Sequence, residues 1–275
     1  MSFHIPQVLI HSNEPLWIDY GIFPRLPHEG EDIYCDSLAF RLGYGYELSK
    51  KLNSLGVETG WCLQYAEPVF QALAKSQAQR DEVSNSLVEI CPTHPTPLAV
   101  SAPLRSGDHR TVIADTHYDL NISWLMEADE KPSWLVLWNW LMNEKLHEII
   151  PYCQQKKIAV CLGITQDENT GSDIEKVVSL LKGVPAVEVM IFHRPPYLPM
   201  TECGWKNSFI ELLQDDIPVI MVEKSDGLQI TSSTSEQKTT HTAANFIEWI
   251  SFYIHHRQLG NDILSAVGYA QSKFR

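Results

Sequence analysis

The sequence predicts an α/β fold in which a parallel sheet is covered by helices on both faces. Four short apolar segments typical of buried strands alternate with stretches typical of helices; they are residues 134–138, 158–162, 187–191 and 218–222. Hydrophobic residues make up 44% of the 275 residues and charged residues only 20%, so the chain has enough apolar material for a large core. This composition excludes a disordered chain and a collagen-like repeat.

The first half of the chain repeats the same alternation. Residues 7–11 are short, apolar and β-branched, which predicts a buried strand. Apolar residues spaced by three or four positions predict a helix over 44–55 that ends at Gly56, and a strand follows this glycine. A second amphipathic helix is expected over 68–79. Alternation at 110–114 beside a Ser-Gly-Asp turn predicts a hairpin at an edge or in a lid.

The last quarter of the chain is more polar. The Ser- and Thr-rich run 231–240 is predicted to be a loop, and residues 243–256 and 262–273 are predicted to form two closing helices. No repeat and no linker interrupts the chain. We therefore expect one domain over residues 1–275.

Charge and apolar patterning exclude several classes of protein. The 21 Lys and Arg against 34 Asp and Glu give a net charge of −13, which argues against nucleic-acid binding. No apolar run reaches the roughly 18 to 20 residues that a membrane span needs, and residues 1–6 lack the pattern of a signal peptide. We expect a cytoplasmic protein without a membrane partner.

No metal site is predicted. The six cysteines are scattered without a CxxC spacing and are interpreted as reduced, mostly buried thiols, Cys161 being a core residue. Asp167 to Gly171 superficially resembles a calcium loop, but its glycine is one position early and Val178 stands at the twelfth position, so we interpret it as a solvated turn. His255 and His256 point about 100° apart on a helix and cannot easily share a metal.

Two common phosphate-binding motifs, GxxxxGK[ST] and GxGxxG, are absent, but the order of four other segments carries a resemblance. Asp19 follows the first strand, residues 42–56 read LGYGYELSKKLNSLG, residues 106–111 read SGDHRT, and residues 239–245 read TTHTAAN. In this order they resemble the substrate-binding acid, the GGxxxNxAxxLxxLG signature, the dGeRt turn and the DTxGAGD signature of the pfkB (ribokinase-like) carbohydrate and nucleoside kinases. The resemblance covers almost the whole chain.

The resemblance implies a fold and a set of site residues. The fold would be a Rossmann-type α/β/α sandwich with a small β-sheet lid formed by about residues 15–40 and 95–115, and the ligand would bind between them at the carboxyl ends of the strands. Substrate-binding positions would be Asp19, Gly43, Glu47 and Arg110. The nucleotide and anion hole would be formed by Gly227, Thr242, Ala243 and Ala244, with Asn245 at the position of the catalytic base and with ATP and Mg²⁺ as cofactors.

The sequence departs from the family where the chemistry occurs. Leu42 replaces the first glycine, Glu47 replaces the substrate-binding Asn, and Asn245 replaces the catalytic Asp. An amide has no basic lone pair to accept the proton of the substrate hydroxyl, and loss of a general base commonly costs about 10²- to 10⁴-fold in rate. Thr242 and Ala244 add Cβ atoms where the backbone must approach a phosphate. These changes predict an impaired or inactive kinase that binds a small polar, sugar-like ligand or a protein partner.

Two alternatives stay open. The chain is an active ATP-dependent sugar or nucleoside kinase if other carboxylates supply the base and metal contacts, the candidates being Asp19, Glu47, Glu223 and Asp226. It is an interaction protein if the lid sheet forms a homodimer, as in many members of the family. Trp17, Tyr44, Tyr46 and Trp138 either line the ligand site or pack in the core and lid.

Overall fold

The computed structural model describes most of the chain. It covers residues 5–23, 25, 28–29, 35, 37–90, 95–103, 109–113, 120, 122–138, 140, 145–166, 187–193, 219–223, 227–232, 235–239 and 246–273. Side chains are described over the same residues except 103–113, 164–187, 189–239 and 246.

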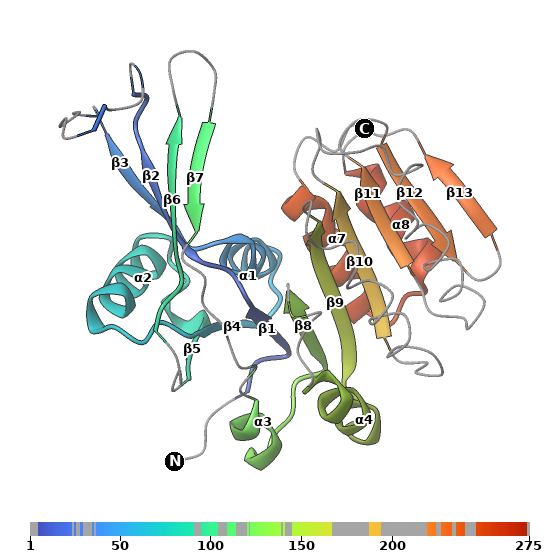
Figure 1. Cartoon of the computed structure of the whole chain (residues 1–275). Helices are drawn as coiled ribbons and strands as arrows, with labels where there is room; N and C mark the ends of the chain where they lie inside the picture. Colours follow the sequence, from blue (N-terminus) through green and yellow to red (C-terminus); the bar gives the residue numbers. More distant parts are fainter. Residues whose placement is uncertain are drawn as a thin grey trace.

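A nine-stranded, mostly parallel sheet forms the centre of the molecule (Figure 1). Its order is β13-β12-β11-β10-β9-β8-β1-β4-β5. The parallel strands are β1 (Val8–Ser12), β4 (Thr59–Leu63), β5 (Leu87–Glu89), β8 (Trp134–Trp138), β9 (Ala159–Gln166), β10 (Val187–His193) and β11 (Val219–Glu223). The four strands predicted from apolar runs are confirmed, and each of them lies in this sheet.

The predicted loop over 231–240 is wrong. Strands β12 (Gly227–Ser232) and β13 (Ser235–Thr239) form an antiparallel hairpin at one edge of the main sheet. β-Branched residues such as Ile230 and Thr231 favour strands, and an edge hairpin tolerates polar side chains that a central strand would not. The main sheet is therefore mostly parallel, as predicted, with this antiparallel hairpin added at its edge.

A second, four-stranded sheet stands apart from the main sheet in Figure 1, and we call it the lid sheet. Its order is β3-β2-β6-β7, with parallel pairing between β2 and β6 and antiparallel pairing elsewhere. The strands are β2 (Leu16–Tyr20), β3 (Leu38–Arg41), β6 (Leu98–Pro103) and β7 (His109–Ile113). Because β2 begins four residues after the end of β1, the lid sheet joins the main sheet at the carboxyl ends of the parallel strands.

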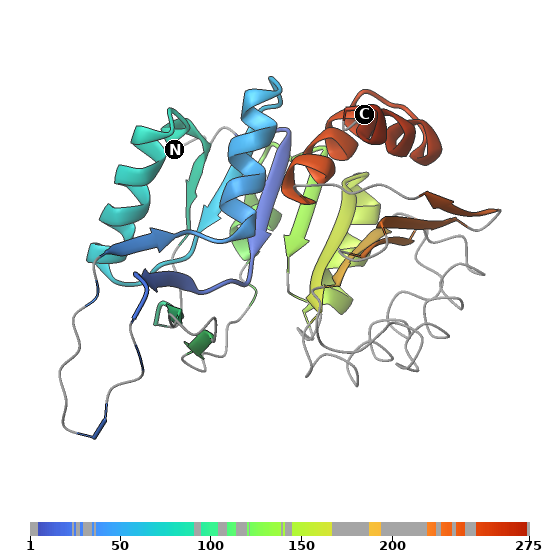
Figure 2. The same cartoon turned by 90° about the horizontal axis from the view of Figure 1, so that it is seen from above.

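Helices cover both faces of the main sheet (Figure 2). One face carries α1 (Tyr44–Ser54), α2 (Pro68–Arg80), α7 (Phe246–Gln258) and α8 (Ile263–Ser272), and the other carries α3 (Ser123–Glu127) and α4 (Leu146–Lys156). A short 3-10 turn, η1 (Ser84–Ser86), precedes β5. The helices predicted over 44–55, 68–79 and 262–273 are confirmed to within two residues. The helix predicted from 243 begins at Phe246 among the described residues.

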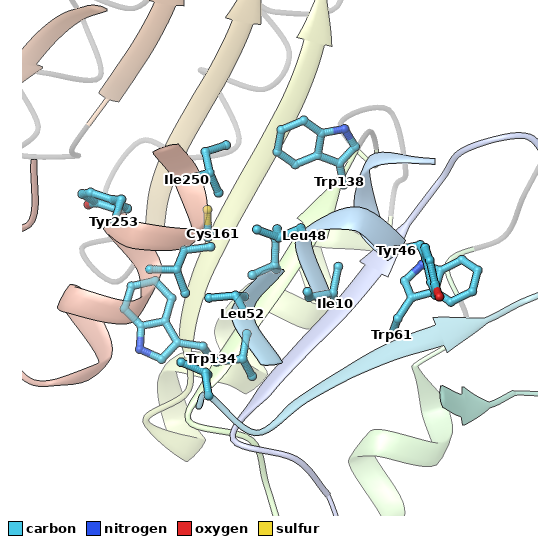
Figure 3. Packing of buried hydrophobic residues seen from close by; sticks show 14 of the residues in the cluster. Ile10, Tyr46, Leu48, Leu52, Trp61, Trp134, Trp138, Cys161, Ile250 and Tyr253 are labelled. Carbon is cyan, nitrogen blue, oxygen red and sulfur yellow. The ribbon is translucent and has the colours of Figure 1, made fainter. Parts of the chain in front are cut away.

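Strand periodicity builds two cores. Along β1, Val8 and Ile10 pack under α1, α2, α7 and α8, whereas Leu9 between them packs under α3 and α4. Alternate residues of a strand point to opposite faces of a sheet, so an apolar strand supplies both cores. Figure 3 shows the larger core, where Trp134, Trp138 and Cys161 lie among the side chains of α1 and α7.

The described cysteines agree with the prediction of buried thiols. Cys62, Cys153 and Cys161 are buried and free, and Cys35 is free and half-buried. Burial raises the pKa of Cys153 to about 12 and that of Cys161 well above its ordinary value, so these thiols are core residues. Cys91 and Cys203 lie outside the described residues.

Candidate functional site

The loop from β1 to β2 brings several polar groups to the place where the lid sheet meets the main sheet. The backbone N–H of Asn13 donates to the carbonyl of Trp138 at 2.8 Å, and that of Leu16 donates to the carbonyl of Pro97 at 2.8 Å. Ser12 accepts a hydrogen bond at Oγ from Trp61 Nε1 at 3.1 Å and another at its carbonyl from Gln64. The loop is therefore fixed at both ends, with Glu14 between them.

Glu14 caps the N-terminus of α1. Its Oε1 accepts from the backbone N–H of Tyr44 at 3.0 Å, and its Oε2 accepts from that of Gly45 at 2.8 Å. Gly43, which precedes the helix, has φ of 89° and ψ of 176°, a conformation essentially restricted to glycine. A Cβ at Gly43 would also lie 2.8 Å from Glu14 Oε2. Sequence reasoning missed Glu14, although a lone carboxylate directly after a buried strand was a usable signal.

Burial sets the ionisation of Glu14. Desolvation raises its pKa from 4.5 to about 7, while the N–H groups of Gly45 and Tyr44, the Ser12 hydroxyl and the positive charge of Arg41 act in the opposite direction. The carboxylate is thus held at the junction by donors from β1 and α1 and by the charge of Arg41 on the lid sheet.

Asp19, the predicted substrate-binding acid, lies on β2 and is bound by Arg41 of β3. Arg41 donates from Nη2 to Asp19 Oδ1 at 2.9 Å and also from Nε to Oδ2, which makes a bidentate ion pair. The Arg41 guanidinium also lies 5.0 Å from the centre of the Trp17 ring. The hydrogen bonds from Arg41 to Asp19 raise the pKa of Arg41.

Glu47 lies in the first turn of α1 and lines a pocket of about 340 Å³ between α1 and α7. Glu47 is exposed to solvent, but partial desolvation by its neighbours raises its pKa above the ordinary value. The first turn of α7 contributes Ile247 and Glu248 to this pocket, and Lys51 Nζ bonds to Glu248 Oε1 at 2.5 Å across it. The other lining residues are Tyr44, Lys50 and Ser54.

The remaining predicted site residues are spread over other elements. Arg110 lies on β7 of the lid sheet, and Gly227 begins β12, where it pairs with Glu223. The four residues directly before α7 in the sequence lie outside the described residues; they are Thr242, Ala243, Ala244 and Asn245. Asp226 also lies outside the described residues. The structure thus brings Gly43, directly before α1, near Glu47 in the first turn of this helix, and it places Asp19 and Arg110 on two strands of the lid sheet.

The four aromatic residues proposed to line the ligand site or to pack in the core lie on β2, α1 and β8. Trp138 and Tyr46 are buried in the larger core, whereas Trp17 and Tyr44 are half-buried. A Cβ at Gly163 of β9 would lie 1.9 Å from Trp138 Cε3, so the indole fills the space beside this glycine. The rings of Tyr44 and Trp138 have centroids 6.3 Å apart. Of the four candidate lining residues, two are therefore core residues.

The described residues include no cluster of three or more His, Cys, Asp or Glu that could hold a metal ion. Over the same part of the chain, every helix is too short or too polar to cross a membrane.

Comparison with known proteins identifies the architecture. No family model and no curated protein matches the sequence. Among solved structures, Arabidopsis thaliana ribokinase complexed with ribose and ATP superimposes with a TM-score of 0.70 and 12% identity, covering 98% of this chain and 91% of that chain. The fold is ribokinase-like.

Two further structures agree with this assignment. A carbohydrate kinase from Agrobacterium tumefaciens has a TM-score of 0.70 and 12% identity over 98% of this chain and 89% of that one. Phosphofructokinase-2 from Escherichia coli, in complex with fructose-6-phosphate, has a TM-score of 0.68 and 12% identity over 98% and 92% of the two chains. At 12% identity, similarity to these structures establishes the fold alone, and any function has to be argued from the residues of the site.

Proposed function

We propose that this chain is a ribokinase-fold protein with impaired or no kinase activity that acts by binding a small polar, sugar-like ligand or a protein partner. The observation that carries the proposal is the bidentate ion pair of Asp19 with Arg41, because it engages both oxygens of the acid that the family resemblance assigns to substrate hydroxyls. Asn245 supports it further, since an amide at the position of the base accepts no proton.

Nucleotide binding is tested by following thermal unfolding with ATP and ADP, with and without Mg²⁺. A ligand that binds only the native state raises its stability by RT ln(1 + [L]/Kd), so binding is detected without catalysis. A rise in the midpoint of thermal unfolding would indicate that the protein binds nucleotide, with ATP and Mg²⁺ as the ligands. If millimolar nucleotide causes no shift, the binding role belongs to another small ligand or to a protein.

An active sugar or nucleoside kinase is the second candidate. The pocket between α1 and α7 favours it, because Glu47 and Glu248 line this pocket and Asn245 directly precedes α7. Asp19, Glu223 and Asp226 complete the available carboxylates. This candidate requires transfer of the γ-phosphate to a hydroxyl in a panel of sugars, nucleosides and vitamin alcohols, and it fails if ATP and Mg²⁺ give no turnover with any of them.

Pairing of two copies through the lid sheet is a third proposal. Leu38 and Phe40 on β3 are 53% and 39% exposed, which is high for large apolar side chains. They lie opposite Tyr20 and Ile18 of β2, and directly opposed residues share one face of a sheet.

The net charge of −13 supports a partner other than nucleic acid. We also propose a cytoplasmic location.

A further inference from the structure

The N-terminus of α1 is occupied by a side chain of the same protein. The first N–H groups of a helix have no acceptor within the helix and attract anions. Here the groups of Tyr44 and Gly45 donate to the two carboxylate oxygens of Glu14, which is only 7% exposed. An external anion would need the same donors and the same space.

The surroundings of Glu14 fit this occupation closely. Gly43 leaves room for it, since a Cβ there would lie 3.0 Å from Glu14 Cδ. Gly45 likewise leaves room for Ser12, because its Cβ would lie 2.4 Å from Ser12 Oγ. Hydrogen bonds from Asn13 to Trp138 and from Leu16 to Pro97 fix the backbone on both sides. The carboxylate is therefore delivered by a fixed loop to a helix end shaped around it.

Charge strengthens the exclusion. Ser12 of β1 and Arg41 of β3 are the polar groups that favour the ionised carboxylate besides the two N–H groups. Once ionised, Glu14 complements the positive end of the helix dipole and repels a second anion.

We propose that Glu14 is a specificity-determining residue, an internal carboxylate that excludes anionic ligands from the N-terminus of α1. A ligand recognised at the junction of α1 and the lid sheet is then neutral or cationic at this point. The exclusion does not depend on whether the protein binds nucleotide or retains any catalysis.

Removing the Glu14 carboxylate by mutation tests the proposal, and inorganic sulfate is the anion used as the probe. Thermal unfolding of the wild type, Glu14→Ala and Glu148→Ala is followed at about pH 8, one unit above the pKa of Glu14, in sulfate and in sodium chloride of equal ionic strength. Glu148 is the matched control, because it is an exposed glutamate in the first turn of another helix, α4. We expect about 50 mM sulfate to raise the midpoint of Glu14→Ala by about 3 °C beyond chloride and to leave the other two proteins unchanged.

Equal sulfate responses in the folded Glu14→Ala variant and in the wild type would overturn the proposal. If Glu14→Ala does not fold, Glu14→Gln replaces it, and amide hydrogen exchange at Tyr44 and Gly45 is the readout. In Glu14→Gln an NH2 group, which cannot accept a hydrogen bond, replaces one of the two carboxylate oxygens, so at least one of the two N–H groups should exchange about tenfold faster than in the wild type. Unchanged exchange at both positions would show that the carboxylate does not hold this helix end.

Discussion

At the scale of single residues, Glu14 and Trp138 determine which hydrogen-bond donors and how much space remain free at the carboxyl edge of the main sheet. Glu14 takes the donors of α1, and Trp138 fills the space beside Gly163. Both side chains are buried, and each is matched to a glycine that could not carry a Cβ without a collision. These close contacts make the edge sensitive to single substitutions.

Glu14 makes stability depend on pH. Its pKa is about 7 in the folded protein and 4.5 as the ordinary value, so between these values the folded state binds more protons than the unfolded state. The free energy of unfolding therefore falls as pH rises from about 4.5 to about 7 and then levels off, with a total loss of about 3 kcal/mol. Urea unfolding of the wild type and of Glu14→Gln checks this. The difference between them should shrink over that range, and a constant difference would contradict the prediction.

Gly163→Ala is expected to destabilise the protein by about 3 kcal/mol, because overpacking of a core typically costs this much. The new Cβ would lie 1.9 Å from Trp138 Cε3. Gly268→Ala in α8 is the control, since no atom lies within 4 Å of a Cβ there. Denaturant midpoints measure both. In a Trp138→Leu background Gly163→Ala should cost less, and an equal cost in both backgrounds would assign the effect to something other than the indole.

Some residue roles were within reach of the sequence and others were not. The burial of Cys161 follows from its place in an apolar run. The ion pair between Asp19 and Arg41 joins residues 22 positions apart, and only the pairing of β2 with β3 brings them together. Glu14 was missed for a related reason: its N–H donors lie about thirty residues further along the chain.

At the scale of elements, a partly buried ion pair between β10 and α7 adds to the apolar packing of α7 on the sheet. Glu188 of β10 is bound by Arg257, and it accepts a hydrogen bond at 2.6 Å from the hydroxyl of Tyr253. Burial and the charge of Glu188 raise the pKa of Tyr253, so the phenol stays a donor. The first turn of α7 borders the pocket that contains Glu47, so this attachment also positions one wall of the pocket.

Glu188→Ala is expected to cost about 3 kcal/mol, because it leaves the Arg257 charge without its partner. The double variant with Arg257→Ala should cost less than the sum of the two single changes. Urea unfolding of the four proteins of this cycle measures the coupling. Additive costs would show that the ion pair does not hold α7.

Element prediction succeeded where hydrophobic periodicity decides the structure. The helix over 44–55 and the strand over 134–138 have unambiguous apolar patterns. The hairpin of β12 and β13 was missed because the run 231–240 is polar, and its strand structure depends on pairing with β11 at the sheet edge. Tertiary pairing of this kind leaves little trace in a local pattern.

At the scale of the whole molecule, the lid sheet is where we expect a second copy to bind. Leu38→Glu with Phe40→Glu should shift the protein towards the monomer, because both side chains lie on the exposed apolar face. Sedimentation velocity over a range of micromolar concentrations measures the assembly. Val69→Glu is the control, since Val69 is an exposed apolar residue on α2. Equal sedimentation of the lid variant and the wild type would contradict pairing through this face.

For the whole molecule, we propose that a ribokinase fold is retained while the kinase reaction is impaired or lost. Phosphoryl transfer from ATP in the presence of Mg²⁺, across sugars, nucleosides and vitamin alcohols, is the most direct measurement, made on the wild type and on Asn245→Ala. We expect that turnover of both proteins falls at least about 10²-fold below ordinary kinase rates and does not differ between them. Turnover at about 1–100 s⁻¹ that Asn245→Ala abolishes would contradict it.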